Sequence, residues 1–263
     1  MTTPTKLFGI PESFSEHGGQ VDLMIDVVHY FMFALFIGWT IFFFICLFKF
    51  RKSNNKKASY HGVTNHVSTH LEIGVVIIEA VLLLGLALPL WKERTDKFDE
   101  VQAQDPVRAR VIGYQFAWNY HYPGADGKFG RIDRRLVANV GDPCIDPNDP
   151  NGWDDYTSSV LKLPVDRPAI LSITSTDVIH NYSIVPMRIQ QDAMPGKDIP
   201  MWFKPIKKME TFVVCGQLCG EGHANMSGVM EVISQSKFDK WAEGQSKESL
   251  EKSKAAQKTV ASL

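Results

Sequence analysis

The sequence has few cysteines and no Cys-x-x-Cys-His motif, so covalent attachment of haem c to this chain is excluded. It also lacks an excess of basic residues. The 28 Lys and Arg are balanced by 29 Asp and Glu, and this gives no indication of a nucleic-acid partner. No internal repeat is visible. The 263 residues suffice for one or two domains with a real core.

Charge is absent from one long apolar run. Residues 27–48 contain no Asp, Glu, Lys or Arg, and residues 73–91 are interrupted only by Glu79. A helix that crosses a bilayer needs about 20 apolar residues, so the sequence predicts two membrane helices. The alternative is a pair of long core helices, which seldom run so far without charge. The polar N-terminus has no pattern of a cleavable signal, so we expect the first helix to be retained.

The segment between the two apolar runs is basic, and its five cationic residues are Lys49, Arg51, Lys52, Lys56 and Lys57. The positive-inside rule puts this segment on the cytoplasmic side, or on the matrix side in an organelle. We therefore expect a transmembrane hairpin over residues 24–91 with a cytoplasmic loop at 51–70. The tail 1–23 and everything after Trp91 then lie on the opposite side.

From about residue 92 to 235 the chain is typical of a soluble β-rich domain. Apolar residues alternate along 107–122 with one phase slip near Ile112, which indicates a β-bulge. Short strands are also predicted over residues 134–140, 168–174, 184–189, 210–214 and 228–233. Such spacing favours a sandwich or barrel. Residues 142–156 are predicted to be an irregular excursion, and the charged tail 236–263 to be a docking helix that frays.

Two thiols, an imidazole and a thioether lie within one glycine-punctuated stretch, CGQLCGEGHANM. On an oxidising side of a membrane, Cys215 and Cys219 alone would suggest a disulfide. His223 and Met226 follow them, however, and the glycines between them allow a tight fold around a small object.

Sulfur and imidazole ligands together select copper, because a structural zinc site rarely includes methionine. A mononuclear blue-copper site uses one cysteine, two histidines and a distant methionine. The extra cysteine here suggests two coppers that share two thiolates, which requires a second imidazole. His180 precedes a strand-like run and is the candidate, whereas His121 is expected near a surface.

At this point the sequence resembles a known family. The segments DVIHNYSIVPMRIQQDAMPG and CGQLCGEGHANMSGVMEV, with the aromatic strand GYQFAWNYHYPG and two leading membrane helices, resemble subunit II of haem–copper cytochrome c oxidases. The resemblance covers nearly the whole chain. It implies a cupredoxin-like Greek-key sandwich or barrel after the helical hairpin.

The resemblance also implies a binuclear CuA centre. Cys215 and Cys219 would bridge both coppers, and His180 and His223 would each bind one. The weak ligands would be Met226 on one copper and the backbone carbonyl of Gln217 on the other. Most relatives have Glu at position 217, where the side chain also reaches magnesium or manganese. The neutral amide is a poorer ligand for a hard cation, so this second metal is not predicted.

Other residues match the family less closely. Phe116 stands where a tryptophan usually accepts electrons, and Trp118 is the one that remains of the usual pair, although both could simply pack. Asp192 matches an interface with subunit I, or is a turn residue. Glu72 matches a proton-entry residue, or caps a helix. Asp177 and the run Asp154-Asp155 could steer a basic donor.

The resemblance implies an electron inlet of a proton-pumping oxidase. It would accept electrons from cytochrome c or a cytochrome domain and relay them to haem in subunit I, where dioxygen is reduced, with subunit III as a further partner. The expected location is the bacterial inner membrane with the copper domain in the periplasm, or else the mitochondrial inner membrane. Alternatives are the copper domain of nitrous oxide reductase, a copper assembly or storage protein, and a copper-free quinol-oxidase subunit II.

Overall fold

The computed structural model describes residues 3–55, 57, 60–61, 65–136 and 142–261. The chain forms two compact units. One consists of Met1–Ile10 and Gln20–Lys97, and the other of Pro11–Gly19 and Phe98–Leu263. Each unit is described by itself.

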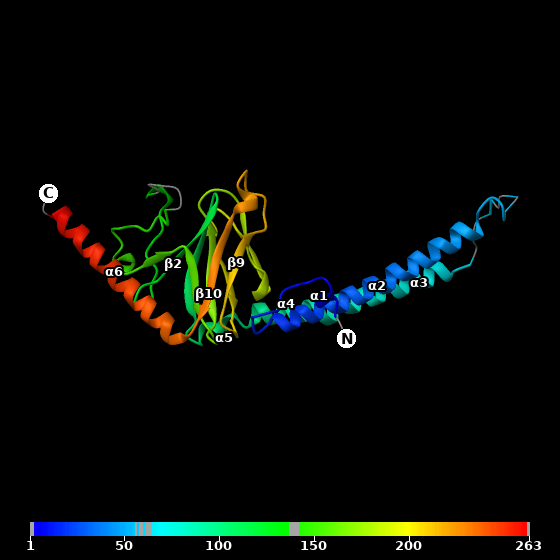
Figure 1. Cartoon of the computed structure of the whole chain (residues 1–263), viewed down its shortest axis with the longest axis horizontal. Helices are drawn as coiled ribbons and strands as arrows, with labels where there is room; N and C mark the ends of the chain where they lie inside the picture. The colour runs from blue at the N-terminus through cyan, green and yellow to red at the C-terminus, as the bar shows by residue number, and fades with distance from the viewer. Residues whose placement is uncertain (1–2, 56, 58–59, 62–64, 137–141, 262–263) are drawn as a thin grey trace. The chain divides into compact units, whose positions relative to one another are not determined.

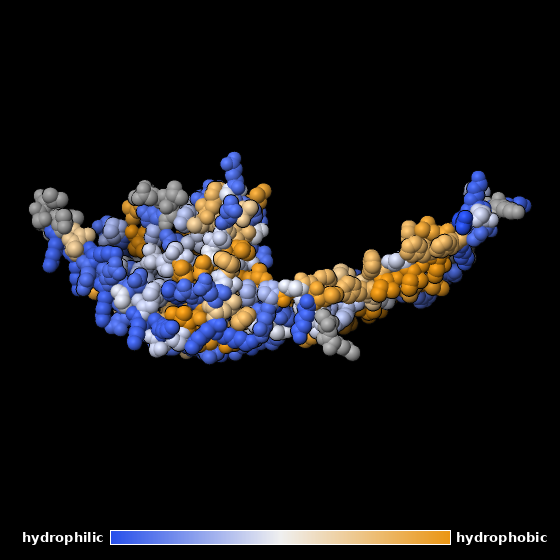
Figure 2. Space-filling model, viewed as in Figure 1, coloured by the Kyte–Doolittle hydropathy of each residue, from blue (hydrophilic) through white to orange (hydrophobic). Residues whose placement is uncertain are grey.

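Helices, two of them long, make up the first unit (Figure 1). They are α1 (Pro4–Leu7), α2 (Gly18–Lys49), α3 (Val67–Leu82), the π-helix η1 (Leu83–Ala87) and α4 (Leu88–Asp96). Helix α2 and the stretch Val67–Gln102 are each long and apolar enough to cross a membrane. Hydrophobic side chains are exposed along much of the long helices in Figure 2. The predicted pair of apolar helices is confirmed, and it fits a two-pass membrane protein.

Two five-stranded sheets form the second unit. One has the order β3-β2-β1-β5-β8, with β3 (Tyr156–Ser158), β2 (Ala117–Tyr122), β1 (Val107–Tyr114), β5 (Ala169–Ser175) and β8 (Ile199–Phe203). The other has the order β4-β10-β9-β6-β7, with β4 (Val160–Pro164), β10 (Ser227–Ile233), β9 (Met209–Cys215), β6 (His180–Ile184) and β7 (Ile189–Ala193). Strands β1 and β5 run parallel, as do β4 and β10.

Alternating side chains from both sheets make one core. Val111, Leu171 and Ile173 point inward from the first sheet, and Tyr182 and Val213 from the second, all fully buried. Because inward and outward residues alternate along each strand, this is the packing of a two-layer sandwich. The predicted cupredoxin-like sandwich after a helical hairpin is confirmed.

The predicted bulge is wrong. Residues 107–122 form two antiparallel strands, and the register pairs Gly113 with Trp118 and Tyr114 with Ala117. Gln115 and Phe116 form the hairpin turn between them. A two-residue turn reverses the chain and restarts the alternation, so it shifts the apolar pattern as a bulge would.

The strand predicted over residues 184–189 is wrong as well, and the described part of the one predicted over 134–140 is helical. Residues 184–189 form a corner, in which the 3₁₀ helix η4 (Val185–Met187) separates β6 from β7 and Arg188 adopts a φ of 53°. Within residues 134–140, Arg134–Leu136 form the 3₁₀ helix η2, and 137–140 lie outside the described residues.

The charged tail is one long helix, α6 (Gln235–Ala261), rather than a helix that frays early. A short helix α5 (Phe98–Gln102) precedes β1, and the excursion before β3 contains the 3₁₀ helix η3 (Pro150–Gly152). Helix α6 runs beside that excursion (Figure 1). Its Ser249 and Ser253 hydroxyls donate to the carbonyl oxygens of Asp155 and Trp153, at 2.5 and 2.9 Å.

Candidate metal centre

The predicted ligands converge at one end of the inner strands of the second sheet. His180 is the first residue of β6, and Cys215 is the last residue of the neighbouring strand β9. The loop from β9 to β10 carries Gln217 and Cys219, the 3₁₀ helix η5 (His223–Asn225) and Met226. Since β6, β9 and β10 are adjacent in the sheet, ligands 35 residues apart in sequence meet here.

The two cysteine sulfurs lie side by side without a disulfide between them. Their Sγ atoms are 3.8 Å apart, and both thiols are free. A metal–thiolate bond is about 2.3 Å long, so sulfurs at this separation can both bond to the same ion. The structure therefore contradicts the alternative that Cys215 and Cys219 form a disulfide.

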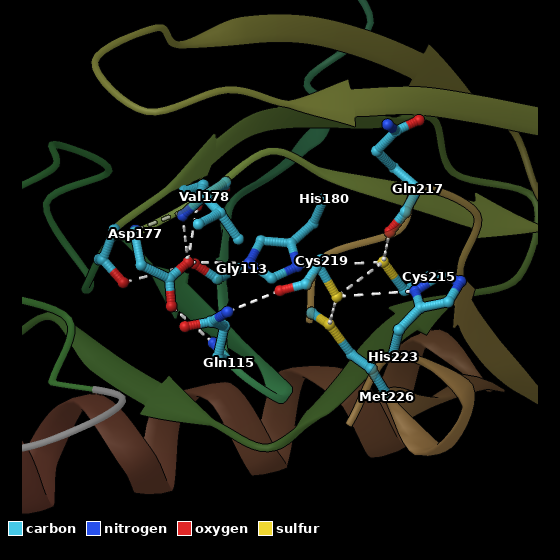
Figure 3. Close-up of polar contacts among 12 residues, drawn as sticks. Gly113, Gln115, Asp177, Val178, His180, Cys215, Gln217, Cys219, His223 and Met226 are labelled. Atoms are coloured by element: carbon cyan, nitrogen blue, oxygen red, sulfur yellow. Dashed lines mark hydrogen bonds and ion pairs between the residues drawn. The ribbon is translucent and has the colours of Figure 1, made fainter. Parts of the chain in front are cut away.

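Each sulfur has its own imidazole. The Nδ1 atom of His180 is 3.9 Å from the Cys215 sulfur, and the Nδ1 atom of His223 is 3.6 Å from the Cys219 sulfur (Figure 3). The candidate ligand atoms of His180, Cys215 and Cys219 all lie within 4.8 Å of one another.

A weaker donor also lies beside each sulfur. The thioether of Met226 is 3.7 Å from Cys219 Sγ, and the carbonyl oxygen of Gln217 is 3.2 Å from Cys215 Sγ. The Gln217 side chain points away from the sulfurs (Figure 3). The six donors thus divide into two similar sets of one thiol, one imidazole and one weak donor. All six predicted metal residues are brought together.

Asp177 fixes the orientation of the His180 ring. Its Oδ1 accepts a hydrogen bond from His180 Nε2 at 2.8 Å, which leaves Nδ1 free to face the sulfurs. Burial by itself raises the pKa of Asp177, but hydrogen bonds from His180, Gln115 and Val178 outweigh it and lower the pKa below its ordinary value. The carboxylate therefore stays ionised and holds the proton on Nε2.

Cys219 is buried against the sulfurs of its neighbours. Burial, followed by the contact with Cys215, raises the pKa of Cys219 to about 11. Without a metal this thiol is protonated at neutral pH, so an incoming metal must displace its proton.

The predicted electron-entry residues lie near the centre. The Trp118 ring is buried, 5.9 Å from the His180 ring between centroids. Phe116 is partly exposed and packs so closely over the cysteine loop that a Cβ on Gly222 would come 2.3 Å from its ring.

The residues predicted for the subunit I interface and for proton entry, Asp192 and Glu72, lie in different units. Asp192 is on β7, where its Oδ1 accepts a hydrogen bond from Asn181 Nδ2 at 2.7 Å. The Asn181 carbonyl in turn accepts the N–H of Gly216, in the cysteine loop. Glu72 lies on α3 in the first unit.

Two expectations about polar residues are wrong. His121 is fully buried rather than near a surface. Asp155 is also buried, and its carboxylate accepts hydrogen bonds from His121 Nε2 and from the N–H groups of Gly124 and Gly130. The Asp154 carboxylate accepts hydrogen bonds from Asp126 and Ser246. The run Asp154-Asp155 is therefore occupied within the fold and forms no free acidic patch.

Sequence reasoning missed Gln115. Its side-chain Nε2 donates to the carbonyl oxygen of Cys219 at 2.6 Å, across 104 residues of sequence. A single glutamine at a hairpin turn has no periodicity or spacing that distinguishes it. Only recognition of the turn itself could have directed attention to it.

Comparisons with known proteins agree on one family. Residues 107–233 match the family model described as cytochrome c oxidase subunit II, periplasmic domain. An alternative cytochrome c oxidase subunit 2 from Bradyrhizobium diazoefficiens is 27% identical over 86% of this chain and 80% of the relative. A cytochrome c oxidase subunit 2 from Cereibacter sphaeroides is 26% identical over 89% and 79%.

A fungal relative and a solved structure are similar too. Cytochrome c oxidase subunit 2 from Pneumocystis carinii is 28% identical over 87% of this chain and 90% of the relative. The crystal structure of the periplasmic domain of cytochrome oxidase subunit II from Bradyrhizobium japonicum is 25% identical, with a TM-score of 0.40, over 54% of this chain and 94% of that one.

Proposed function

We propose that the chain is a cytochrome c oxidase subunit II, whose family model matches residues 107–233, and that it is the electron inlet of a haem–copper oxidase. It accepts electrons from cytochrome c at a binuclear copper centre and relays them to haem in subunit I, where dioxygen is reduced and protons are pumped. The observation that carries this proposal is the pair of free thiols 3.8 Å apart, each with its own imidazole.

The donor set fits copper. Thiolate, thioether and imidazole are soft or intermediate ligands, and the two neighbouring thiols would both be available to hold a pair of copper ions. We propose His180, Cys215, Gln217, Cys219, His223 and Met226 as the ligands, with Gln217 acting through its carbonyl oxygen. When bound, such a pair supplies one reversible electron, spread over both ions. The neutral amide of Gln217 is a poorer ligand for a hard cation than a carboxylate, so we propose no magnesium or manganese beside it.

The protein's part is to hold the ligands of this site rigidly in place. Cys219 and Met226 are buried, and adjacent strands fix three ligand-bearing segments. Asp177 keeps the proton on Nε2 of His180, so that Nδ1 presents its lone pair to the centre. Rigid ligands limit the rearrangement that accompanies each electron, which favours a relay over bond-making chemistry.

Partners and orientation follow from the same proposal. Phe116 and Trp118 lie on the route from the donor, Asp192 contacts subunit I, and Glu72 serves proton entry into subunit I; subunit III is a further partner. The helical hairpin 24–91 crosses the bacterial inner membrane. The tail 1–23, the copper domain 92–235 and the helix within 236–263 lie on the periplasmic side.

An EPR experiment tests the copper proposal. The full chain in detergent is loaded with copper, and we expect two coppers per chain with hyperfine structure from two equivalent copper nuclei. Met226→Ile should keep both coppers with an altered spectrum and potential, whereas Cys219→Ser should lose the shared electron. A mononuclear blue-copper signal, or a chain that retains no copper, would refute the proposal.

A further inference from the structure

The turn between β1 and β2 contacts both halves of the candidate centre. From this turn, the backbone N–H of Gln115 donates to Asp177 Oδ2 at 2.7 Å. The side-chain Nε2 of the same residue donates to the carbonyl oxygen of Cys219 at 2.6 Å. Figure 3 shows Gln115 between the two partners. One residue therefore contacts the His180 segment through its backbone and the cysteine loop through its side chain.

The contact with Asp177 continues to a ligand. The other oxygen of Asp177 accepts hydrogen bonds from His180 Nε2 at 2.8 Å and from the Val178 N–H at 2.7 Å. A continuous chain of hydrogen bonds therefore runs from the Cys219 carbonyl through Gln115 and Asp177 to the His180 ring. This chain adds to the β6–β9 pairing and to the bond from the Gly216 N–H to the Asn181 carbonyl as a link between the two ligand segments.

The cysteine loop is shaped to receive the turn. Gly220 has a φ of +134°, and a Cβ there would come 2.9 Å from Gln115 Nε2 and 3.1 Å from the Phe116 ring. A Cβ on Gly222 would come closer still to that ring. Glycine at these two positions lets the backbone approach closely enough for the amide of Gln115 to reach the Cys219 carbonyl.

We infer that Gln115 is a positioning residue for the copper centre, which rests on the proposed function. It touches neither a ligand atom nor a site for an ion, and acts by fixing the peptide that carries the Cys219 thiol relative to His180. Its side-chain hydrogen bond is partly buried, so replacing it with a bond to water would cost free energy. Without the bond, the Cys219 peptide is held to the His180 segment only through the β6–β9 pairing and the bond from the Gly216 N–H to the Asn181 carbonyl, so it is less restrained.

Gln115→Met isolates the side-chain contact. Methionine has nearly the same length but no donor, and the backbone N–H to Asp177 remains. Five residue pairs hold β1 to β2, so the hairpin itself is kept. In the copper-free chain in detergent, we expect amides of residues 217–223 to exchange with deuterium roughly 2- to 10-fold faster. The matched control is Gln104→Met, at an exposed position after α5, and it should leave this exchange unchanged.

The copper-loaded chain gives the second measurement. We expect Gln115→Met to bind two coppers, with unequal hyperfine couplings at the two nuclei and a shifted reduction potential. Gln115→Lys supplies a donor of sufficient length and should restore slow exchange. Exchange, hyperfine couplings and potential that all match the wild type in Gln115→Met would overturn the inference. So would a Lys variant that exchanges as fast as the Met variant, because packing alone would then explain the effect.

The two proposals fail in different ways. A wild-type chain that binds no copper refutes the proposed function. Deuterium exchange in the copper-free Gln115→Met variant then still tests whether Gln115 holds the Cys219 peptide in place. A wild-type chain with a normal binuclear signal and an unaffected Gln115→Met variant refutes only the positioning role. If Gln115→Met does not fold, Gln115→Lys against Gln104→Met provides the same comparison of exchange, and slow exchange in the Lys variant supports the inference whereas fast exchange overturns it.

Discussion

At the scale of single residues, His121 is a buried histidine held between a carboxylate and a guanidinium. Its Nε2 donates to Asp155 Oδ2 at 2.5 Å, and Arg110 Nη1 donates to its Nδ1 at 3.1 Å. The Phe129 ring covers it, with centroids 5.2 Å apart. Since Nδ1 accepts a hydrogen bond, the ring is neutral and carries its proton on Nε2. The turn before β3 is thereby fastened to the first sheet.

This environment makes stability depend on pH. Burial lowers the pKa of His121 below its ordinary value near 6.5, although Asp155 acts in the opposite direction. Below about pH 6.5 this histidine binds a proton in the unfolded chain but not in the folded chain. The free energy of unfolding therefore falls as the pH is lowered through that range. We expect His121 to contribute a slope of up to about 1.4 kcal/mol per pH unit to the free energy of unfolding.

Calorimetry between pH 5 and 8 measures this slope, which corresponds to a difference of about one bound proton between the unfolded and the folded chain. His121→Gln keeps a polar side chain but cannot titrate, so it should be less stable at neutral pH and show a flatter profile. The exposed His61 provides the control, since His61→Gln should leave the profile unchanged. An equally steep profile in His121→Gln would contradict the assignment to this residue.

Single residues also explain why the clustering of the proposed ligands could be predicted. Cys215, Cys219, His223 and Met226 lie within one short segment, so their spacing alone indicates a soft metal site. His180 lies 35 residues away and was found only because the chemistry needs a second imidazole. The contact of Gln115 with Cys219 spans 104 residues and depends on where one hairpin turns, which no local pattern encodes.

At the scale of elements, the helix α6 docks through an aromatic cluster. The Trp241 ring stands edge-on to Tyr122 at 5.2 Å and to Tyr156 at 5.4 Å between centroids. Phe238, one turn earlier, is buried in the same core. Aromatic pairs in this geometry stabilise beyond their buried area.

We expect Trp241→Ala to lower the free energy of unfolding by about 2–4 kcal/mol, because it empties a half-buried aromatic site. Differential scanning calorimetry of the chain in detergent measures the change. Phe212→Ala removes an aromatic ring of β9 that is 69% exposed, and should change stability by less than about 0.5 kcal/mol. Equal losses in the two variants would show that α6 docking does not depend on this cluster.

The second half of α6 is attached differently, through hydroxyls. Ser249 and Ser253 donate to backbone carbonyls of the excursion before β3. We expect the double variant Ser249→Ala, Ser253→Ala to speed deuterium exchange in the last turns of α6 by roughly 10-fold, since each bond contributes about 1 kcal/mol or less. Ser236→Ala, at an exposed position in the first turn, is the control. Unchanged exchange would mean that these bonds do not hold the helix.

Elements show where sequence patterns fail. The apolar alternation over residues 107–122 was correct. A bulge and a hairpin turn both produce the same phase slip in such a pattern, so the sequence could not distinguish them. The apolar run 184–189 contains a corner in which Pro186 and Arg188 end one strand and start the next. A run of six residues is too short to distinguish a strand from such a corner.

At the scale of the whole molecule, orientation in the membrane depends on competing charges. Five basic residues lie between the two apolar segments, but Lys92, Arg94 and Lys97 follow the second one. The positive-inside rule counts charges in short loops, whereas long domains are translocated largely regardless of charge. The three basic residues precede a long domain, so we give the loop between the helices the greater weight.

We therefore predict that the loop at residue 53 lies inside and the β domain outside. Cysteine introduced by Ser53→Cys should react with a membrane-impermeant thiol reagent only after the cells are permeabilised, and Ser236→Cys should react in intact cells. Labelling of the unmodified chain gives the background from its own thiols. Replacing the five loop cations with glutamine should weaken this asymmetry, because three basic residues beyond the second helix then outnumber those of the loop. The opposite pattern, with residue 53 accessible in intact cells, would place the proposed copper ligands on the inner face and contradict a donor that arrives from outside.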